Sequence, residues 1–209
     1  EAFPYPMVAN DWNQIIVYGQ SLSDGATGSP ALSTTQPQAN ITFGGGVRSR
    51  SGVGIDSFKP MVEASVETIT SGLSNYAVKR AVEKNGVSAQ SHKIFGSACG
   101  AGGYRIDMLS KGSAWWTNQF LPHCRGATAL NPATTIQCVA WLQGEANSGD
   151  GNPVYTPRLE YKNALKQLTN EINTEAQTTT GQSTPVIMLC YQHSTYAKVN
   201  NGGTQLATL

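Results

Sequence analysis

The sequence predicts an α/β fold with a parallel sheet. Two observations support this prediction. Short apolar runs typical of buried strands occupy residues 15–18, 93–98, 135–141 and 185–191. The longer stretches between them space apolar residues three and four apart, as amphipathic helices do. Strands that alternate with helices are joined by right-handed crossovers and form a parallel sheet covered on both faces. We therefore expect a three-layer α/β/α domain with a flavodoxin-like sheet, formed by residues 1–209 as one unit.

The first half of the chain has clear signals for a strand, a loop and a helix. Residues 15–18 are β-branched or aromatic, and Gly19 allows a sharp turn that leads to Ser21. Residues 26–50 are rich in Gly, Ser and Thr, which predicts a long loop of the kind usually kept for binding. A helix is expected to end at Asn85 and Gly86, which tolerate left-handed backbone. Its apolar stripe consists of Val62, Val66, Ile69, Leu73 and Ala77.

Two further helices complete the predicted order. Residues 106–120 form one of them, made irregular by Gly112. For the other, Thr156 and Pro157 supply an N-cap and a first helical position. Its apolar stripe consists of Tyr161, Leu165, Leu168 and Ile172. Another helix is expected to begin where the chain ends, so the sheet should lack its C-terminal strand in this chain.

Composition narrows the classes of partner. Lys and Arg number 14 and Asp and Glu 13, for a net charge of +1, so we expect no nucleic-acid partner. No apolar run approaches the roughly 18 residues of a membrane span, so we expect no membrane partner. The weakly charged, Gly-rich and hydroxyl-rich composition favours an extracellular, cell-surface or virion-associated protein. The start at Glu1 rather than Met predicts that a leader or upstream domain has been removed.

The four cysteines do not predict a metal site, because none of them lies in a CxxC pair. Cys138 and Cys190 lie in apolar runs, where cysteine usually acts as a small hydrophobic residue. A disulfide between Cys99 and Cys124 is an open alternative for an exported chain.

Polar residues and glycines follow the first three predicted strands. Ser21 follows the first, Gly102 and Gly103 follow the second, and Gln143 and Glu145 follow the third. If the strands are parallel, their carboxyl ends share one edge of the sheet, where ligands bind in open α/β folds. A serine nucleophile needs donors aimed at the developing oxyanion, and two backbone amides plus a carboxamide would suit this role.

These blocks resemble the SGNH/GDSL hydrolases, and most closely the sialate O-acetylesterase-type carbohydrate esterases. The resemblance rests on "GQS" after the first strand, "GG" after the second and "WLQGE" after the third. It implies that Ser21 is the nucleophile and that Gly102 or Gly103 donates a backbone amide to the oxyanion. It further implies that Gln143 is the side-chain donor, while Glu145 organises the oxyanion hole or orients a catalytic partner.

The chain departs from the family at two places. The family often has Asn after the serine, where this chain has Leu22. Its Asp-x-x-His block is absent, and the histidines of this chain are His92, His123 and His193. His92 and His123 are expected to be structural or solvated, whereas His193 follows the fourth strand and is an alternative base. We expect the catalytic histidine beyond Leu209, on a downstream segment or a separate chain.

The resemblance implies a serine esterase that removes O-acetyl groups from a carbohydrate, with no metal and no cofactor. A catalytically inactive module that only binds glycans is the alternative, favoured by the missing Asp-x-x-His. A flavodoxin-like nucleotide binder fits poorly, since "GQSLSDG" has few glycines and no lysine for a phosphate loop.

Overall fold

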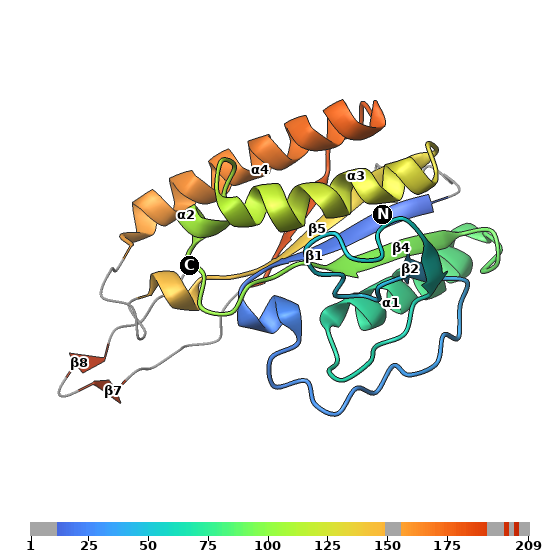
Figure 1. Cartoon of the computed structure of the whole chain (residues 1–209), viewed down its shortest axis with the longest axis horizontal. Coiled ribbons are helices and arrows are strands. Elements are labelled where there is room, and N and C mark those ends of the chain that lie inside the picture. The colour runs from blue at the N-terminus through green and yellow to red at the C-terminus, as the bar shows by residue number, and fades with distance from the viewer. Residues whose placement is uncertain (1–11, 149–155, 192–198, 201–202, 205–209) are drawn as a thin grey trace.

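The computed structural model describes residues 12–148, 156–191, 199–200 and 203–204. A six-stranded sheet with the strand order β3-β2-β4-β1-β5-β6 lies at its centre (Figure 1). Its strands are β1 (Trp12–Gly19), β2 (Ile41–Phe43), β3 (Phe58–Pro60), β4 (Lys93–Ala98), β5 (Thr134–Leu142) and β6 (Ile187–Cys190). The four strands expected from the sequence are β1, β4, β5 and β6, and all of them are present.

The sheet is parallel except at one edge. β1 pairs in parallel with both β4 and β5, and β5 pairs in parallel with β6. The short β2 lies parallel to β4, whereas β3 runs antiparallel to β2. The prediction of a parallel sheet is therefore confirmed for five strands, and β3 is the exception. β2 and β3 span only three residues each within loop-like sequence, which is too short for a periodic signal.

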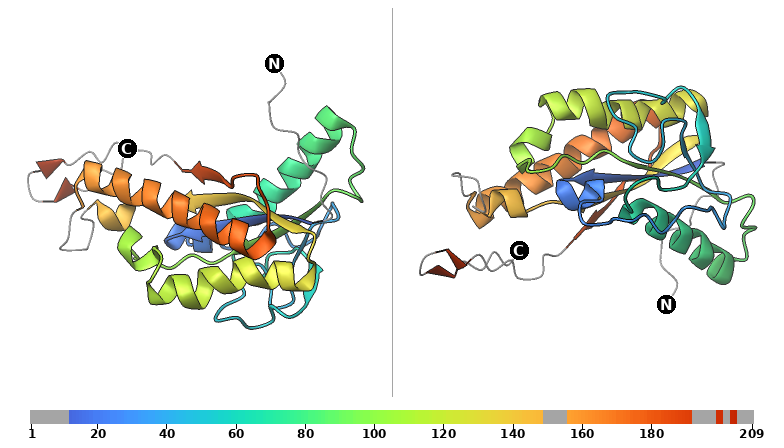
Figure 2. Two further views of the ribbon diagram at one scale, coloured as in Figure 1. Left: turned by 90° about the horizontal axis from the view of Figure 1, so that it is seen from above. Right: turned by 60° about the horizontal axis from the view of Figure 1, so that its bottom comes forward.

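Helices cover both faces of the sheet, as the three-layer prediction requires (Figures 1 and 2). α1 (Ile69–Asn85) lies on one face, and α3 (Leu121–Leu130) and α4 (Arg158–Thr180) lie on the other. The chain runs from β1 to β4 in one direction across the sheet and from β5 to β6 in the other. Right-handed crossovers that run in opposite directions put their helices on opposite faces of the sheet. The central strands are therefore covered by helices on both faces.

The buried face of α1 differs from the predicted stripe. The helix begins at Ile69, because the Thr68 side chain accepts a hydrogen bond from the Thr70 amide and caps it, so Val62 and Val66 lie outside it. Ile69 is exposed, and the buried residues of the helix are Thr70, Ser71, Ser74, Val78 and Ala81. The physical reason is close packing, since a Cβ on Gly96 of β4 would collide with Met61 and Thr70.

The predicted helix end at Asn85 and Gly86 is confirmed. Gly86 has φ +65°, and its amide donates to the Val82 carbonyl at 3.0 Å. Residues 106–120, in contrast, do not form one helix. They contain α2 (Ile106–Leu109), a turn in which Gly112 has φ +92°, and the π-helical segment η2 (Trp116–Phe120), which continues into α3.

The stripe of α4 is confirmed, with Tyr161, Leu168 and Ile172 buried and Leu165 packed against the core. The helix starts one residue after Pro157, and no side chain caps it. Thr156 instead accepts a hydrogen bond from the Asn147 carboxamide at 2.8 Å. The main core lies between the sheet and the α3–α4 layer and includes Ile16, Tyr18, Val139 and Trp141.

The cysteines are free thiols, so Cys99 and Cys124 are not joined by a disulfide. Both are buried in the main core, and burial raises their pKa values well above the usual value, which keeps them protonated. Among the helices within the described ranges, none is long and apolar enough to cross a membrane.

Candidate active site

The structure brings the ends of β1, β4 and β5 together at one edge of the sheet. β1 lies between the other two strands, with Val17 beside Ala98 of β4 and Gly19 beside Leu142 of β5. Ser21 begins the 3₁₀ turn η1 (Ser21–Asp24) directly after β1. Gly102 and Gly103 follow β4 and are exposed, and Gln143 and Glu145 follow β5. The predicted meeting of these blocks at one sheet edge is therefore observed.

Close backbone contacts hold the Ser21 turn at this edge. The Gln20 amide donates to the Leu142 carbonyl at 2.8 Å, so η1 is tied to the end of β5. A Cβ on Gly19 would overlap this same carbonyl, and Gly19 has φ +137°, which L side chains rarely adopt. A Cβ on Gly100 would likewise overlap the hydroxyl of Ser23. The glycine of "GQS" is therefore required because two backbones approach closely at this point.

Gln20 connects the first block to the third. Its side chain is 4% exposed, and its Oε1 accepts hydrogen bonds from the amides of Gly144 and Ala146 at 3.3 and 3.0 Å. The Gln20 carboxamide thus fixes where the loop after β5 lies relative to Ser21. Sequence reasoning missed this residue, although a glutamine between Gly19 and the candidate nucleophile was a signal that could have pointed to it.

Gln143 is held by a buried network. Tyr161 of α4 receives a hydrogen bond from the Trp141 indole at 3.1 Å, and its hydroxyl lies 2.7 Å from Gln143 Oε1. This places the oxygen of the carboxamide toward Tyr161. The amide nitrogen Nε2 therefore faces the other way and donates to the Tyr104 carbonyl at 3.2 Å and to Asn147 Oδ1 at 2.5 Å.

These contacts give Gln143 a structural role that the sequence did not show. With both amide hydrogens engaged, donation to an oxyanion requires one of them to change partner, and the longer bond to Tyr104 is the weaker of the two. The role of Gln143 in an oxyanion hole stays a prediction.

Asn147 joins three parts of the site and was also missed. Its Oδ1 accepts from the Ile106 amide at 3.0 Å as well as from Gln143, and its Nδ2 donates to Thr156 at 2.8 Å. It thereby links the loop after β4, the loop after β5 and the start of α4. The side chain is 3% exposed, so these bonds satisfy a buried polar group.

A cluster of charges lies beside the Ser21 turn. Asp24 forms an ion pair with Arg50, and Arg50 also donates to the Gly100 carbonyl at 2.6 Å. Arg48 is 4.0 Å from the Asp24 carboxylate. Burial raises the pKa of Asp24, while the charges of Arg50 and Arg48 act in the opposite direction. The end of the predicted 26–50 loop thus reaches the site, and Asp24 joins an ion pair between η1 and this loop.

The described histidines do not supply a base for Ser21. His92 precedes β4 and so lies at the opposite edge of the sheet. His123 of α3 is fully buried and bonded to Ser97 and Ser49. His193 lies outside the described residues, so the structure does not place it. Within residues 12–148 and 156–191, no group of His, Cys, Asp and Glu could hold a metal ion.

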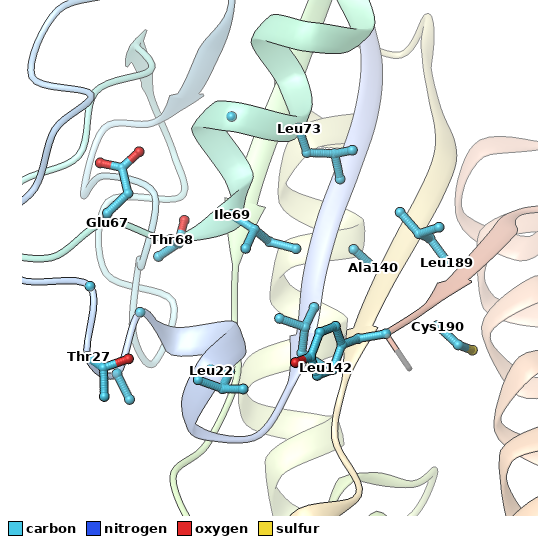
Figure 3. Close-up of a pocket in the computed structure, with 15 residues that line it drawn as sticks. Leu22, Thr27, Glu67, Thr68, Ile69, Leu73, Ala140, Leu142, Leu189 and Cys190 are labelled. Atoms are coloured by element: carbon cyan, nitrogen blue, oxygen red, sulfur yellow. The ribbon is translucent and has the colours of Figure 1, made fainter. Parts of the chain in front are cut away.

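A cavity of about 840 Å³ opens beside η1 on the α1 side of the sheet (Figure 3). Its lining is mostly apolar and includes Leu22, Ile69, Leu73, Ala140, Leu142 and Leu189. Leu22 stands where the resembled family often has Asn. Its contact with this cavity is a physical reason for an apolar residue next to Ser21.

Among known proteins, the chain is similar to solved structures. No protein-family model matches the sequence, and no curated protein matches it either. A carbohydrate acetylesterase from Xanthomonas citri aligns with a TM-score of 0.50 and 17% identity, over 88% of this chain and 41% of that chain. A protein from Arabidopsis thaliana aligns with a TM-score of 0.49 and 15% identity, over 93% of this chain and 90% of that chain.

The fold class predicted from the sequence is thereby confirmed. The chain has a mostly parallel α/β/α architecture and shares the fold of a carbohydrate acetylesterase. It spans less than half the length of the Xanthomonas protein.

Proposed function

We propose that the protein is a serine esterase that removes O-acetyl groups from a carbohydrate outside the cell, or at a cell or virion surface. The observation that carries this proposal is the position of Ser21. It lies on a tight turn at the carboxyl edge of the sheet, and β1 runs between β4, which is followed by the exposed Gly102 and Gly103, and β5, which is followed by the Gln143 carboxamide. The fold shared with a carbohydrate acetylesterase supports the same reaction.

The chemistry follows from this placement. The Ser21 hydroxyl attacks the ester carbonyl and loses its proton to a base, and the negative charge moves to the carbonyl oxygen. The Gly102 or Gly103 amide and Gln143 would stabilise this oxyanion, with Glu145 organising the loop that carries Gln143. The tetrahedral intermediate then collapses, its bond to the sugar oxygen breaks, and this oxygen takes up the proton held by the base and leaves as a hydroxyl. Water hydrolyses the acetyl-serine in a second step and releases acetate.

The base is proposed to come from an Asp-x-x-His segment downstream of Leu209 or on a separate chain. Among the residues that the structure describes, no histidine lies at the Ser21 edge, which supports this proposal. A serine without its base retains only the rate that binding and oxyanion stabilisation supply. Loss of activity in His193→Ala, in a chain that is otherwise fully active, would identify His193 as the base instead.

The missing Asp-x-x-His block favours a second candidate function, that of a catalytically inactive module that binds glycans. The two functions differ in turnover, because the module would bind acetylated sugar without releasing acetate.

The experiment measures acetate release from p-nitrophenyl acetate and from an acetylated oligosaccharide, with and without native downstream residues. In the protein with its native downstream residues, we expect Ser21→Ala to lower the rate at least about a thousandfold, because the nucleophile is lost. Ser29→Ala, a matched change at an exposed serine of the next loop, should leave the rate unchanged. A fluorophosphonate should label Ser21, and a stable adduct on another serine with Ser21 unmodified would contradict the assignment.

A further inference from the structure

A second cavity, of about 430 Å³, lies next to the candidate active site on the α2–η2 side of the loop after β4. It is connected to the site through Trp115, whose indole N–H donates to the Cys99 carbonyl at 2.8 Å. Cys99 is the first residue after β4, four residues before Gly103. The volume lies within the range of about 300–1,000 Å³ that small-molecule sites occupy.

Two half-buried aromatic side chains form one wall. Trp115 and Tyr104 meet edge to face with ring centroids 5.1 Å apart. The Arg50 guanidinium lies 5.2 Å from the Trp115 ring centroid, and the same guanidinium is held by Asp24 and Gly100. The indole is therefore fixed by a hydrogen bond, an aromatic contact and a cation before any ligand arrives. Side chains fixed in this way lose little entropy on binding.

Polar, uncharged residues complete the lining of this cavity. Gln119 is buried and holds the Arg50–Ser51 loop in place, with its Oε1 3.0 Å from the Ser51 amide and its Nε2 3.2 Å from the Ser51 hydroxyl. Ser51 has φ +51°, an uncommon conformation for a residue other than glycine. Asn118 is exposed and lines the cavity. Backbone strain of this kind next to a cavity is typical of binding sites.

The chemistry of this lining selects a class of ligand. None of the described residues that line the cavity carries a charge, so the site favours a neutral ligand over an anion or a cation. Aromatic rings have electron-rich faces that attract the weakly positive C–H groups of a pyranose ring. Carboxamide and hydroxyl groups exchange hydrogen bonds with sugar hydroxyls, because both sides donate and accept.

From the fixed Trp115–Tyr104 pair and the uncharged polar residues that line the same cavity, we infer that this cavity is a subsite for an uncharged sugar unit. That unit would belong to the same oligosaccharide whose acetylated neighbour reaches Ser21. The inference rests on the proposed esterase function for the identity of the neighbouring unit, but its binding chemistry is tested independently.

The test measures sugar binding apart from turnover. Tetrasaccharides of xylose, glucose and mannose, each with and without O-acetyl groups, are titrated calorimetrically into the Ser21→Ala protein. We expect at least one of them to bind, and Trp115→Ala to weaken that binding roughly tenfold or more. Asn118→Ala should weaken it severalfold, and Tyr76→Ala, at an aromatic residue of α1 that is 60% exposed, should leave it unchanged.

Each outcome either supports or overturns the proposed sugar subsite. It is overturned if none of the tetrasaccharides binds, or if the folded Trp115 and Asn118 variants bind as tightly as their parent. Should Trp115→Ala fail to fold by circular dichroism, Asn118→Ala decides, because its side chain is exposed. Trp115-dependent binding without acetate release by the protein carrying its native downstream residues would retain the subsite and remove the esterase. If the protein hydrolyses p-nitrophenyl acetate but both variants bind the tetrasaccharide as tightly as their parent, the esterase proposal is retained and the subsite is overturned.

Discussion

Single residues decide how closely the strands and turns of the site approach one another. Gly19 lets β1 end against the Leu142 carbonyl, and Gly100 lets the loop after β4 pass the Ser23 hydroxyl. Gln20 and Tyr161 then hold the loop after β5 through hydrogen bonds to buried groups. Ser21 is therefore positioned by its neighbours in space.

At Gly19, substitution by Ala should strongly destabilise the protein. The added Cβ would overlap the Leu142 carbonyl, and the backbone would keep a φ of +137° that disfavours Ala. Overpacking and backbone strain together should lower the free energy of unfolding by about 3 kcal/mol or more. Urea denaturation measures this loss. Gly102→Ala is the matched control, since a Cβ there meets no atom within 4 Å, and equal stability losses in both variants would contradict the argument.

Tyr161→Phe should affect both stability and turnover. The change removes the hydroxyl that lies 2.7 Å from Gln143 Oε1 and 3.1 Å from the Trp141 indole nitrogen, so buried polar groups lose a partner. Unfolding free energy should fall by about 1–3 kcal/mol. If Gln143 serves the oxyanion, kcat for an acetyl ester should also fall because its carboxamide is less well oriented. Normal kcat in a destabilised variant would restrict the network to a structural role.

At the scale of elements, α3 shows how a helix is fixed to the sheet by a polar residue. His123 lies 2.7 Å from the Ser49 carbonyl through Nε2 and 3.0 Å from the Ser97 hydroxyl through Nδ1. A carbonyl can only accept, so Nε2 carries the proton and Nδ1 accepts from Ser97. The Gln14 carboxamide of β1 adds a bond of 2.7 Å to the backbone carbonyl of His123. These bonds connect α3 with β1, β4 and the loop that holds Arg50.

The protonation of His123 predicts how stability depends on pH. Burial lowers its pKa from 6.5 to about 4, and the charge of Arg50 acts in the same direction, against the hydrogen bond to Ser49. The unfolded chain therefore binds more protons between these two values. The contribution of His123 is complete above about pH 6.5 and is lost as the pH falls toward about 4, up to roughly 3 kcal/mol.

An NMR titration of the imidazole signals, assigned with a His123→Gln variant, measures this pKa directly. The His123 resonance should stay that of a neutral ring down to about pH 5. A midpoint near the ordinary value of about 6.5 would contradict the prediction. Urea denaturation at pH 7.5 and at pH 4.5 gives the accompanying change in stability.

At the scale of the whole molecule, one sheet connects two unequal layers. The main core on the α3–α4 side contains Tyr18, Phe120 and Trp141, and smaller clusters around Met61 and Val78 lie under α1. β1 contributes residues to both sides, because successive side chains of a strand point to opposite faces. Folding of either layer therefore depends on the same central strand.

We expect the chain to unfold in one cooperative transition. Far-ultraviolet circular dichroism follows the helices, while fluorescence follows Trp12 and Trp141 in the sheet and Trp115 and Trp116 near η2. Because these elements share β1 and its cores, both signals should have the same urea midpoint. Separate midpoints would show that the chain contains more than one unit and would contradict the prediction of a single domain.

Much of the architecture could be predicted from local sequence. The runs that became β1, β4, β5 and β6 are short and mostly apolar, and such runs between turn residues are typical of buried strands. Their alternation with helices determined a parallel sheet, which in turn placed Ser21, Gly102 and Gln143 at one edge. These inferences succeeded because they depend on neighbours along the chain and on one topological rule.

Only the tertiary structure decided the rest. The buried face of α1 followed from its close approach to Gly96. The roles of Gln20 and Asn147 depend on partners up to 126 positions away, and the sugar-sized cavity is built from separate loops. A hydrogen bond between residues that are distant in sequence leaves no periodic signal. The sequence by itself therefore determined which strands lie together, whereas only the tertiary structure decided which side chains are in contact.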